Sequence, residues 1–233
     1  MRAVSRDGPG ANVAPTSAFS YTASMNRPML LPGSADALLF DLGRVVLDVD
    51  FKKTLACWAG HAGCEPADLA GRFSRDEFYQ RHEKGELSDA EFFQALRTAL
   101  GIAISDAQFL EGWNAIFSGE MPGIAPLLER AARSVPLYAF SNTNAAHVEH
   151  FSSAYAGVLG YFRELFLSSA IGLRKPDAEA YDHVVKAIGA PAERIVFFDD
   201  LAENIEGARA RGLTAVHVTS SDDVAEAMAA LGI

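Results

Sequence analysis

Four groups of polar side chains stand where apolar runs of the sequence end, and their types suit chemistry on an anionic substrate. The first is Asp41, which follows the apolar run 37–40. Burying an unpaired carboxylate is costly, so Asp41 should face a crevice, a metal or a cation. The other groups are Ser141 with Asn142, Lys175, and Asp199 with Asp200.

The adjacent carboxylates Asp199 and Asp200 follow the apolar run 195–198. Like charges at the end of a buried strand repel each other and need a cation, and hard oxygen ligands of this type suit Mg²⁺. A solvated turn is the alternative reading. Asn204 can support a metal ligand there, or it can begin the next helix.

Lys175, Ser141 and Asn142 could together hold a phosphate group. A lysine ammonium binds anionic oxygens as a point charge and neutralises a nearby carboxylate. A hydroxyl with backbone N–H groups near a helix start makes a phosphate seat. The sequence also allows ordinary readings, because Lys-Pro-Asp often begins a helix and small polar residues are common caps.

The elements between these groups must bring them together. Predicted strands lie at 37–40, Val135–Phe140, Leu165–Leu167, Arg194–Phe198 and Thr214–Val218, with helices between them. Strands separated by helices pair in parallel through right-handed crossovers. We therefore predict an α/β fold, an open doubly wound parallel sheet of Rossmann-like type. All carboxyl ends of such a sheet lie at one edge, so the four groups should share a crevice.

The chain divides into three predicted parts. Residues 1–35 are rich in Gly, Pro, Ser, Thr and Asn without apolar periodicity, which predicts a disordered N-terminal tail. Residues 51–118 carry apolar side chains at helical spacing and should form an inserted helical cap. Residues 36–50 and 119–233 form the Rossmann-like core, and Ser118–Gly123 is the expected return linker.

Within the cap, Ser88 and Glu91 form a capping box for a helix over Asp89–Leu100. Trp58 and Trp113 lie at helical spacing, where aromatic residues are more often core than substrate contacts. We therefore expect both to be buried.

Composition restricts the partners. The net charge of −10 argues against nucleic acid and anionic membranes, which are bound through clustered Lys and Arg. No stretch is long enough to span a bilayer. The two cysteines suggest a reducing, cytoplasmic location. We expect a monomer or weak homodimer with a small-molecule substrate.

Cys57, His61 and Cys64 are spaced i, i+4 and i+7, which on a continuous helix would align three soft ligands. Gly60 and Gly63 are expected to interrupt the helix, and no fourth ligand is in sequence reach. Small buried thiols are common in proteins, so the sequence favours buried cysteines without a metal over a zinc site.

In the order Asp, Ser, Lys, Asp-Asp, the four groups resemble the haloacid dehalogenase-like superfamily of hydrolases, over Ala37–Val218. The chain is most similar to bacterial sugar-phosphate phosphatases of the α-D-glucose-1-phosphate phosphatase type. It shares their FDLG opening, an H-E-x-G stretch at His82, Glu83 and Gly85, and S-N-T-N and F-F-D-D stretches, the last followed by N-I-E-G-A. The resemblance implies a Mg²⁺-dependent phosphatase acting on a small phosphate ester, a sugar phosphate such as glucose 1-phosphate.

The resemblance also implies a role for each residue. Asp41 would be the nucleophile that forms an aspartyl phosphate, with Lys175 as the second catalytic residue. The Mg²⁺ ligands would be Asp41, the backbone carbonyl of Gly43, and at least one of Asp199 and Asp200. Phosphoryl contacts would come from Ser141, Asn142 and Lys175. Separately from the resemblance, His82 lies in a polar stretch of the cap beside Glu83 and Lys84, and we expect it to contact the sugar.

Gly43 departs from the pattern, because most phosphatases of this superfamily have a second Asp there as general acid and base. Such catalysis is typically worth roughly 10² to 10⁴ in rate. The leaving oxygen could be acidic, as an anomeric hydroxyl is, or His82 could supply the proton, or catalysis could be lost. The resemblance to a sugar 1-phosphate phosphatase favours the first.

Two other functions stay open. True haloacid dehalogenases also lack the second Asp and need no metal, and a catalytically silent sugar-phosphate-binding protein would keep the site without turnover. A phospho-receiver domain uses similar residues, but its acidic pair precedes the phosphorylated Asp, which is the reverse of the order here.

Overall fold

The computed structural model describes residues 28–233. Most of the predicted tail, residues 1–27, lies outside the described residues. The rest of the predicted tail, residues 28–35, is described, and Gly33 within it is hydrogen-bonded to the core. Gly33 N donates to Leu231 O at 3.1 Å, and Arg194 Nη2 donates to Gly33 O at 3.0 Å. Residues around Gly33 thus contact the last helix of the chain.

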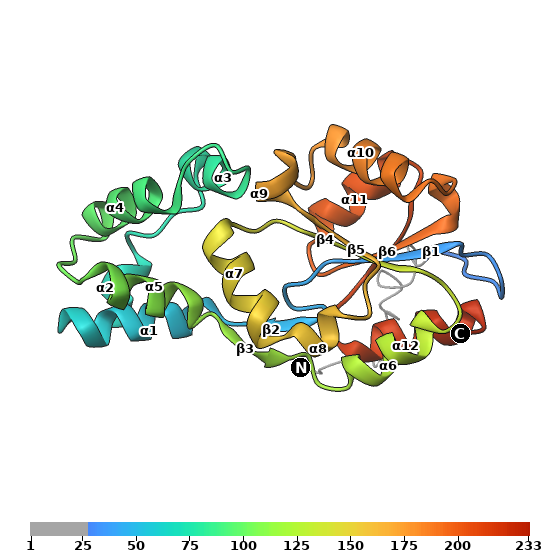
Figure 1. Cartoon of the computed structure of the whole chain (residues 1–233), viewed down its shortest axis with the longest axis horizontal. Helices are drawn as coiled ribbons and strands as arrows, with labels where there is room; N and C mark the ends of the chain where they lie inside the picture. The colour runs from blue at the N-terminus through green and yellow to red at the C-terminus, as the bar shows by residue number, and fades with distance from the viewer. Residues whose placement is uncertain (1–27) are drawn as a thin grey trace, which may run out of the picture.

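A five-stranded sheet with the order β5-β4-β1-β6-β7 lies at the centre of the molecule (Figure 1). Every neighbouring pair is parallel, which confirms the predicted fold class. The strands are β1 (Ala37–Phe40), β4 (Leu137–Ser141), β5 (Glu164–Leu167), β6 (Ile195–Asp199) and β7 (Thr214–His217). Phe40 pairs with Ala139 on one side and Phe198 on the other, so the carboxyl ends of β4, β1 and β6 adjoin.

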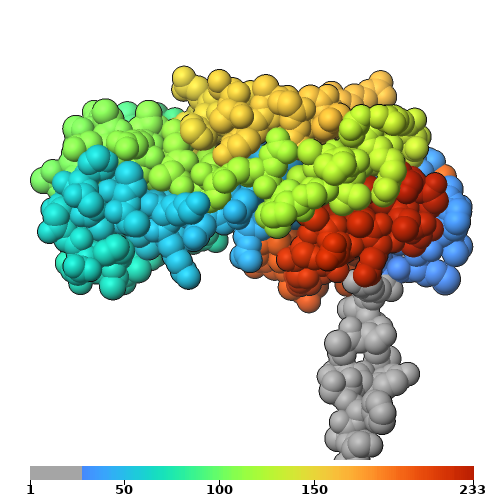
Figure 2. Space-filling view, turned by 90° about the horizontal axis from the view of Figure 1, so that it is seen from below, coloured from blue at the N-terminus to red at the C-terminus, as the bar shows by residue number. Residues whose placement is uncertain are grey.

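Helices cover both faces of the sheet (Figure 1), which is why β1, β4 and β6 are buried throughout. Successive side chains of a strand point to opposite faces. On β1, Leu38 and Phe40 join one apolar cluster, whereas Ala37 and Leu39 join the other. Helices α6 (Ile124–Ala132) and α12 (Ser221–Leu231) lie side by side on the first face (Figure 2).

The second face is covered by α10 (Ala178–Ile188) and α11 (Ala202–Ala210). The remaining helical segments of the core are α7 (Ala145–Ala154), α8 (Ala156–Leu159), α9 (Ser168–Ile171) and a 3₁₀ turn at Ala192–Arg194. Within residues 28–233, no helix combines the length and apolar character that crossing a membrane requires.

Five helices lie to one side of the sheet and form the cap (Figure 1). They are α1 (Phe51–Ala62), α2 (Pro66–Ala70), α3 (Glu77–Glu83), α4 (Asp89–Leu100) and α5 (Asp106–Asn114). The capping box of Ser88 and Glu91 is present as predicted. Trp58 and Trp113 are both buried in a separate apolar cluster, as expected. The exact domain boundaries stay a prediction.

The chain passes between core and cap through a short antiparallel ribbon that the sequence did not reveal. It consists of β2 (Leu47–Val49) and β3 (Phe117–Glu120). The first segment lies in the predicted core segment 36–50 but outside its expected strand, and the second overlaps the expected linker Ser118–Gly123. Each strand is too short to show periodicity, and the two pair with each other from opposite ends of the cap insertion, so only tertiary contact reveals them.

His147 on α7 lies buried where the core meets the cap. Asn144 Oδ1 accepts hydrogen bonds from Trp113 Nε1 (3.2 Å) and His147 N (3.1 Å), which turns its amide nitrogen toward His147 Nδ1. The imidazole proton therefore sits on Nε2, 3.1 Å from the Trp113 carbonyl oxygen. Burial lowers the pKa of His147 to about 4.

We expect acid to weaken the fold through His147. Below the ordinary pKa of 6.5, the unfolded chain takes up a proton that the folded chain rejects down to about pH 4. The free energy of unfolding should therefore fall by up to roughly 3 kcal/mol across that range. Urea unfolding at several pH values measures this fall in the free energy of unfolding. His147→Gln should reduce the fall by the same amount. An identical slope in both proteins would exclude His147 as the cause.

Candidate active site

Lys175 joins two of the predicted carboxylates at the carboxyl edge of the sheet. Its Nζ donates to Asp41 Oδ1 at 2.6 Å, to Asp199 Oδ2 at 2.7 Å and to the Phe140 carbonyl at 2.7 Å. Asp41 directly follows β1, and Asp199 is the last residue of β6, so the sheet itself places these two side chains side by side. Lys175 is 1% exposed and thus almost sealed from solvent.

Asp199 is held on both of its oxygens. Leu201 N donates to Oδ1 at 2.8 Å, and Asn204 Nδ2 lies 2.9 Å from Oδ1 and 3.0 Å from Oδ2. The sequence left two roles open for Asn204, the support of a metal ligand or the start of a helix. Its hydrogen bonds to Asp199 fit the support of a carboxylate. Asp199 is therefore fixed in orientation before any ligand arrives.

Asp200 stands outside this network. Its Oδ2 lies 3.6 Å from Arg44 Nε, and its side chain is 14% exposed. Burial raises the pKa of Asp200, and the neighbouring charge of Asp199 raises it further. Because Asp199 already binds Lys175, Asp200 is better placed to offer an oxygen to a metal ion.

The charges at this edge do not balance. Burial raises the pKa of Asp41 to about 7, with Asp199 adding to the effect and Lys175 opposing it. Burial acts against the charge of Lys175 as well, but Asp199 and Asp41 outweigh it and raise the pKa of the ammonium. Asp41 and Asp199 thus share one sealed ammonium, and Asp200, paired with the exposed Arg44, adds a third carboxylate at the same edge. This excess of hard anionic oxygens fits a divalent cation such as Mg²⁺.

Gly43 lies beside the Asp41 carboxylate in the loop after β1. A Cβ atom built on Gly43 would lie 3.7 Å from Asp41 Oδ2 and 3.5 Å from Val49 Cγ2, which are ordinary contacts. Gly43 is also not among the glycines with positive φ. Neither space nor backbone conformation therefore requires glycine here, and a side chain at this position would reach the carboxylate.

Asn142 contacts the backbone of Lys175 through both ends of its amide. Its Nδ2 donates to Lys175 O at 2.8 Å, and Lys175 N donates to its Oδ1 at 2.8 Å. The Asn142 side chain thus positions the lysine, which sequence reasoning missed. Ser141 is buried at the end of β4, directly after the carbonyl that Lys175 contacts. Phosphoryl contacts from Ser141 and Asn142 stay a prediction.

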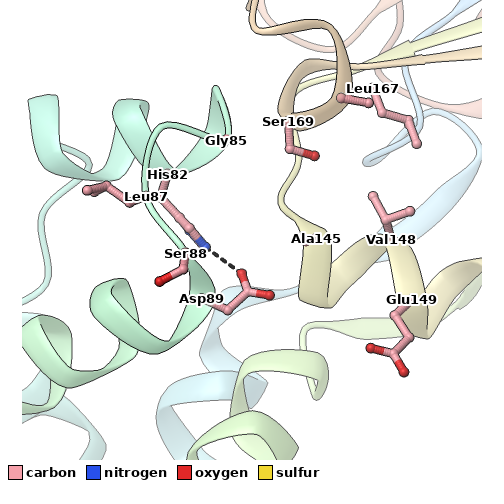
Figure 3. Close-up of a pocket in the computed structure, with 11 residues that line it drawn as sticks. His82, Gly85, Leu87, Ser88, Asp89, Ala145, Val148, Glu149, Leu167 and Ser169 are labelled. Atoms are coloured by element: carbon pink, nitrogen blue, oxygen red, sulfur yellow. Dashed lines mark hydrogen bonds and ion pairs between the residues drawn. The ribbon is translucent and has the colours of Figure 1, made fainter.

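His82 is buried in the cap, with its ring stacked on Phe92 at a centroid distance of 4.0 Å. Its Nε2 lies 2.7 Å from Asp89 Oδ1, and its Nδ1 is buried without a hydrogen-bond partner. It borders a cavity of about 610 Å³ between the cap and the core, where Ser88, Ala145, Val148, Leu167 and Ser169 also lie (Figure 3). Asp41, Lys175 and Asp199 are not in this lining. A sugar contact from His82 stays a prediction.

Comparison with known proteins identifies the family. Residues 35–212 match the haloacid dehalogenase-like hydrolases. The chain belongs to this family. It is 25% identical over 173 residues to a D-ribitol-5-phosphate phosphatase of Bacteroides thetaiotaomicron, covering 72% of this chain and 84% of that protein. It is 26% identical over 152 residues to the sesquiterpene phosphatase astK of Aspergillus oryzae, covering 65% of this chain and 77% of that protein.

The structure of this haloacid dehalogenase-like hydrolase agrees with a solved relative. A family enzyme of Bacteroides thetaiotaomicron, crystallised with magnesium and inorganic phosphate, superposes with a TM-score of 0.71 at 25% identity, covering 80% of this chain and 95% of that one. The predicted superfamily is thereby confirmed. The phosphatases among the relatives support a phosphoric monoester hydrolase.

Sequence reasoning also missed a clamp between cap and core, next to Lys175. Glu83 Oε2 at the end of α3 accepts from Arg174 Nε at 3.1 Å and pairs with Nη2 at 3.0 Å. Ser168 Oγ lies 2.7 Å from the Glu83 carbonyl and accepts from Thr143 N at 2.8 Å. The position of Arg174 immediately before Lys175 and of Glu83 in the H-E-x-G stretch was the available signal.

Proposed function

We propose that this hydrolase is a Mg²⁺-dependent phosphatase acting on a small phosphorylated metabolite, a sugar phosphate such as glucose 1-phosphate. The observation that carries the proposal is the position of Lys175 Nζ, 2.6 Å from Asp41 and 2.7 Å from Asp199, with Asp200 following Asp199 in the chain. Two carboxylates that share one ammonium, with a third carboxylate beside them, favour a further divalent cation, and the site then suits a dianionic substrate. A relative that acts on ribitol 5-phosphate and one solved with magnesium and phosphate support it.

Asp41 is the proposed nucleophile. Lys175 holds its Oδ1, so Oδ2, on the side of Gly43, is the oxygen left to attack phosphorus. The new O–P bond forms as the bond to the leaving oxygen breaks, which gives an aspartyl phosphate on Asp41. Water then attacks phosphorus, releases phosphate and restores the carboxylate.

Asp41, Asp200 and the Gly43 carbonyl would hold Mg²⁺, which would neutralise charge on the phosphoryl oxygens. Lys175 supplies a second positive charge at the same edge of the sheet. Asn142 keeps that charge in place through the lysine backbone, and Asn204 keeps Asp199 in the orientation that Lys175 needs. These bonds exist before substrate binds, so the site needs little rearrangement during the reaction.

Removal of divalent metal tests the function. With glucose 1-phosphate as substrate, we expect a chelator to lower phosphate release by at least roughly 10²-fold, because the metal offsets charge in the transition state. Added Mg²⁺ should restore the rate. Phosphate release that survives thorough chelation would contradict the proposal.

A dehalogenase is the second candidate, and the absence of a side chain at Gly43 is the observation that favours it, since halide leaves without protonation. It predicts metal-independent halide release from a 2-haloacid and no phosphate release. The silent sugar-phosphate-binding protein predicts binding of glucose 1-phosphate with no turnover of any substrate. Parallel assays of the same preparation for phosphate, halide and binding separate the three.

A further inference from the structure

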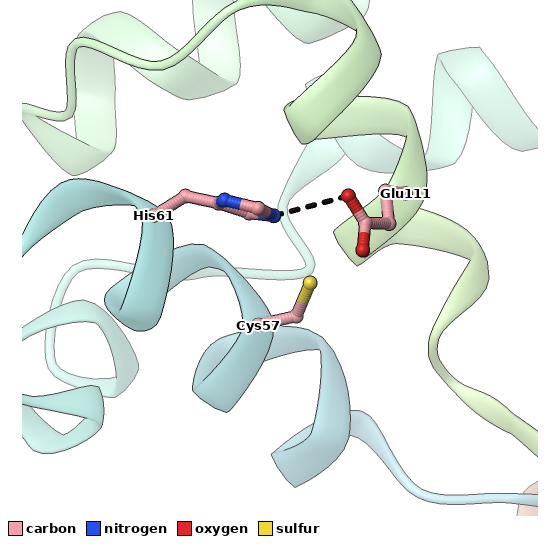
Figure 4. A group of neighbouring side chains, drawn as sticks. All are labelled: Cys57, His61 and Glu111. Carbon is pink, nitrogen blue, oxygen red and sulfur yellow. Dashed lines mark hydrogen bonds and ion pairs between the residues drawn. The ribbon is translucent and has the colours of Figure 1, made fainter.

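Three side chains of different chemistry converge on the surface of the cap, away from the sheet edge. Cys57 and His61 lie on α1 and Glu111 lies on α5, and one ligand atom of each lies within 4.8 Å of the others (Figure 4). The sequence led us to expect that Gly60 interrupts the helix, but α1 is continuous over Phe51–Ala62. The i, i+4 spacing therefore places Cys57 and His61 on one face.

Packing beneath the cluster fixes the distance between α1 and α5. Trp58, next to Cys57, donates from Nε1 to the Phe109 carbonyl at 2.9 Å. A Cβ on Gly112, next to Glu111, would lie only 2.2 Å from Trp58 Cδ1, so the two helices approach as closely as glycine allows. The buried side chains thus hold the three surface groups together without needing any ligand.

The atoms that these three side chains offer favour a particular class of metal ion. We propose that Cys57, His61 and Glu111 bind Zn²⁺ or a similar thiophilic divalent cation, with water as the fourth ligand. Thiolate, imidazole and carboxylate are the ligands that Zn²⁺ uses in proteins, whereas Mg²⁺ takes oxygen ligands. Zinc bond lengths of about 2.0 to 2.3 Å place ligand atoms roughly 3.3 to 3.8 Å apart. His61 Nε2 and Glu111 Oε2 are already 3.1 Å apart, so small side-chain rotations complete the site.

Gln108, one turn before Glu111 on α5, contacts the other ring nitrogen of His61. Ser105 N donates to Gln108 Oε1 at 2.9 Å, which turns the Gln108 amide nitrogen toward His61 Nδ1, at 3.2 Å. The His61 proton therefore sits on Nε2, facing Glu111. When the cation binds, this proton moves to Nδ1, the S–H bond of Cys57 breaks, and the thiol proton passes to the buffer.

The Gln108 amide donates toward Nδ1, so it opposes the proton position that the bound metal requires. A carboxylate at this position would accept from both Nδ1–H and Ser105 N. We therefore expect Gln108→Glu to tighten metal binding by roughly 10- to 100-fold, the usual size of such neighbouring effects. If His61 only formed a surface ion pair with Glu111 and bound no metal, Gln108→Glu would not tighten metal binding.

The test is titration of the full chain with Zn²⁺ and with Co²⁺, in excess Mg²⁺ so that the catalytic carboxylates are occupied. We expect one Zn²⁺ per chain and, with Co²⁺, a thiolate-to-metal charge-transfer band. Cys57→Ser and Glu111→Gln should each weaken Zn²⁺ binding by at least roughly tenfold, because each removes one of three protein ligands. Cys64→Ser is the matched control and should change neither measurement.

The thermal midpoint of each metal-free variant shows that the cap is still folded, and Zn²⁺ should raise that midpoint for the wild type but not for Cys57→Ser. Binding that Cys57→Ser leaves unchanged would overturn the proposal. So would the absence of a charge-transfer band, or its loss in Cys64→Ser. The site is independent of the proposed phosphatase activity, so failure of one says nothing against the other.

Discussion

Asp41→Asn should abolish turnover, with kcat for glucose 1-phosphate falling by at least roughly 10⁴-fold, the scale seen when a covalent nucleophile is removed. An amide oxygen can still accept the bond from Lys175 Nζ that Asp41 Oδ1 accepts at 2.6 Å. It cannot attack phosphorus as a carboxylate does. Phosphate release over time measures the loss, and circular dichroism checks that the variant is folded.

Two further measurements make this result specific to Asp41. Rapid quenching of the wild-type reaction should trap labelled phosphate on Asp41, and the variant should trap none. Asp182→Asn serves as the control, because it makes the same Asp-to-Asn change at an exposed ion pair with Arg211 and should keep the wild-type turnover. Turnover that Asp41→Asn leaves intact would exclude the covalent route.

Gly43→Asp should raise the rate on substrates with a poor leaving group. The position accommodates a Cβ at 3.7 Å from Asp41 Oδ2, and its backbone is not in the left-handed region. A carboxylic acid there can protonate the leaving oxygen and then activate water, for which roughly 10² to 10⁴ is the typical gain. We expect that gain in kcat/KM for glucose 6-phosphate, a primary alkyl ester.

Glucose 1-phosphate should gain much less from the same substitution, because its anomeric oxygen leaves more readily. Gly43→Asn is the matched control, since it has the same size but transfers no proton. If Asp and Asn at position 43 give equal rates on both substrates, the missing side chain is not what limits this enzyme. Equal gains on both substrates would instead contradict the leaving-group explanation.

The sequence determined the sheet and its edge residues, because both depend on local signals. Runs of apolar residues between helices predict buried parallel strands, and β1 and β7 begin where predicted. β4 spans Leu137–Ser141, not Val135–Phe140; Pro136 has no N–H to donate and instead accepts from Leu38 through its carbonyl. The convergence of Asp41 and Asp199 also follows from parallel topology alone, whereas Lys175 lies beyond α9 and is held in place by Asn142.

The roles of individual polar groups needed the tertiary structure. The phosphoryl contact predicted for Asn142 stays a prediction, but the sequence did not reveal that its amide binds the backbone of Lys175, 33 positions away. It placed His82 in a polar stretch, yet the ring stacks against Phe92 and is buried. Hydrogen-bond partners so distant in sequence leave no periodic pattern, so composition and spacing cannot reveal them.

The cap shows the same division between local and long-range information. The capping box at Ser88 and the burial of Trp58 follow from neighbours within a few positions. The partner of Cys57 and His61 does not, because Glu111 arrives from a different helix, and the sequence offered Cys64 in its place. Helix spacing alone gives two ligands on one face, and only the packing of α1 on α5 supplies the third.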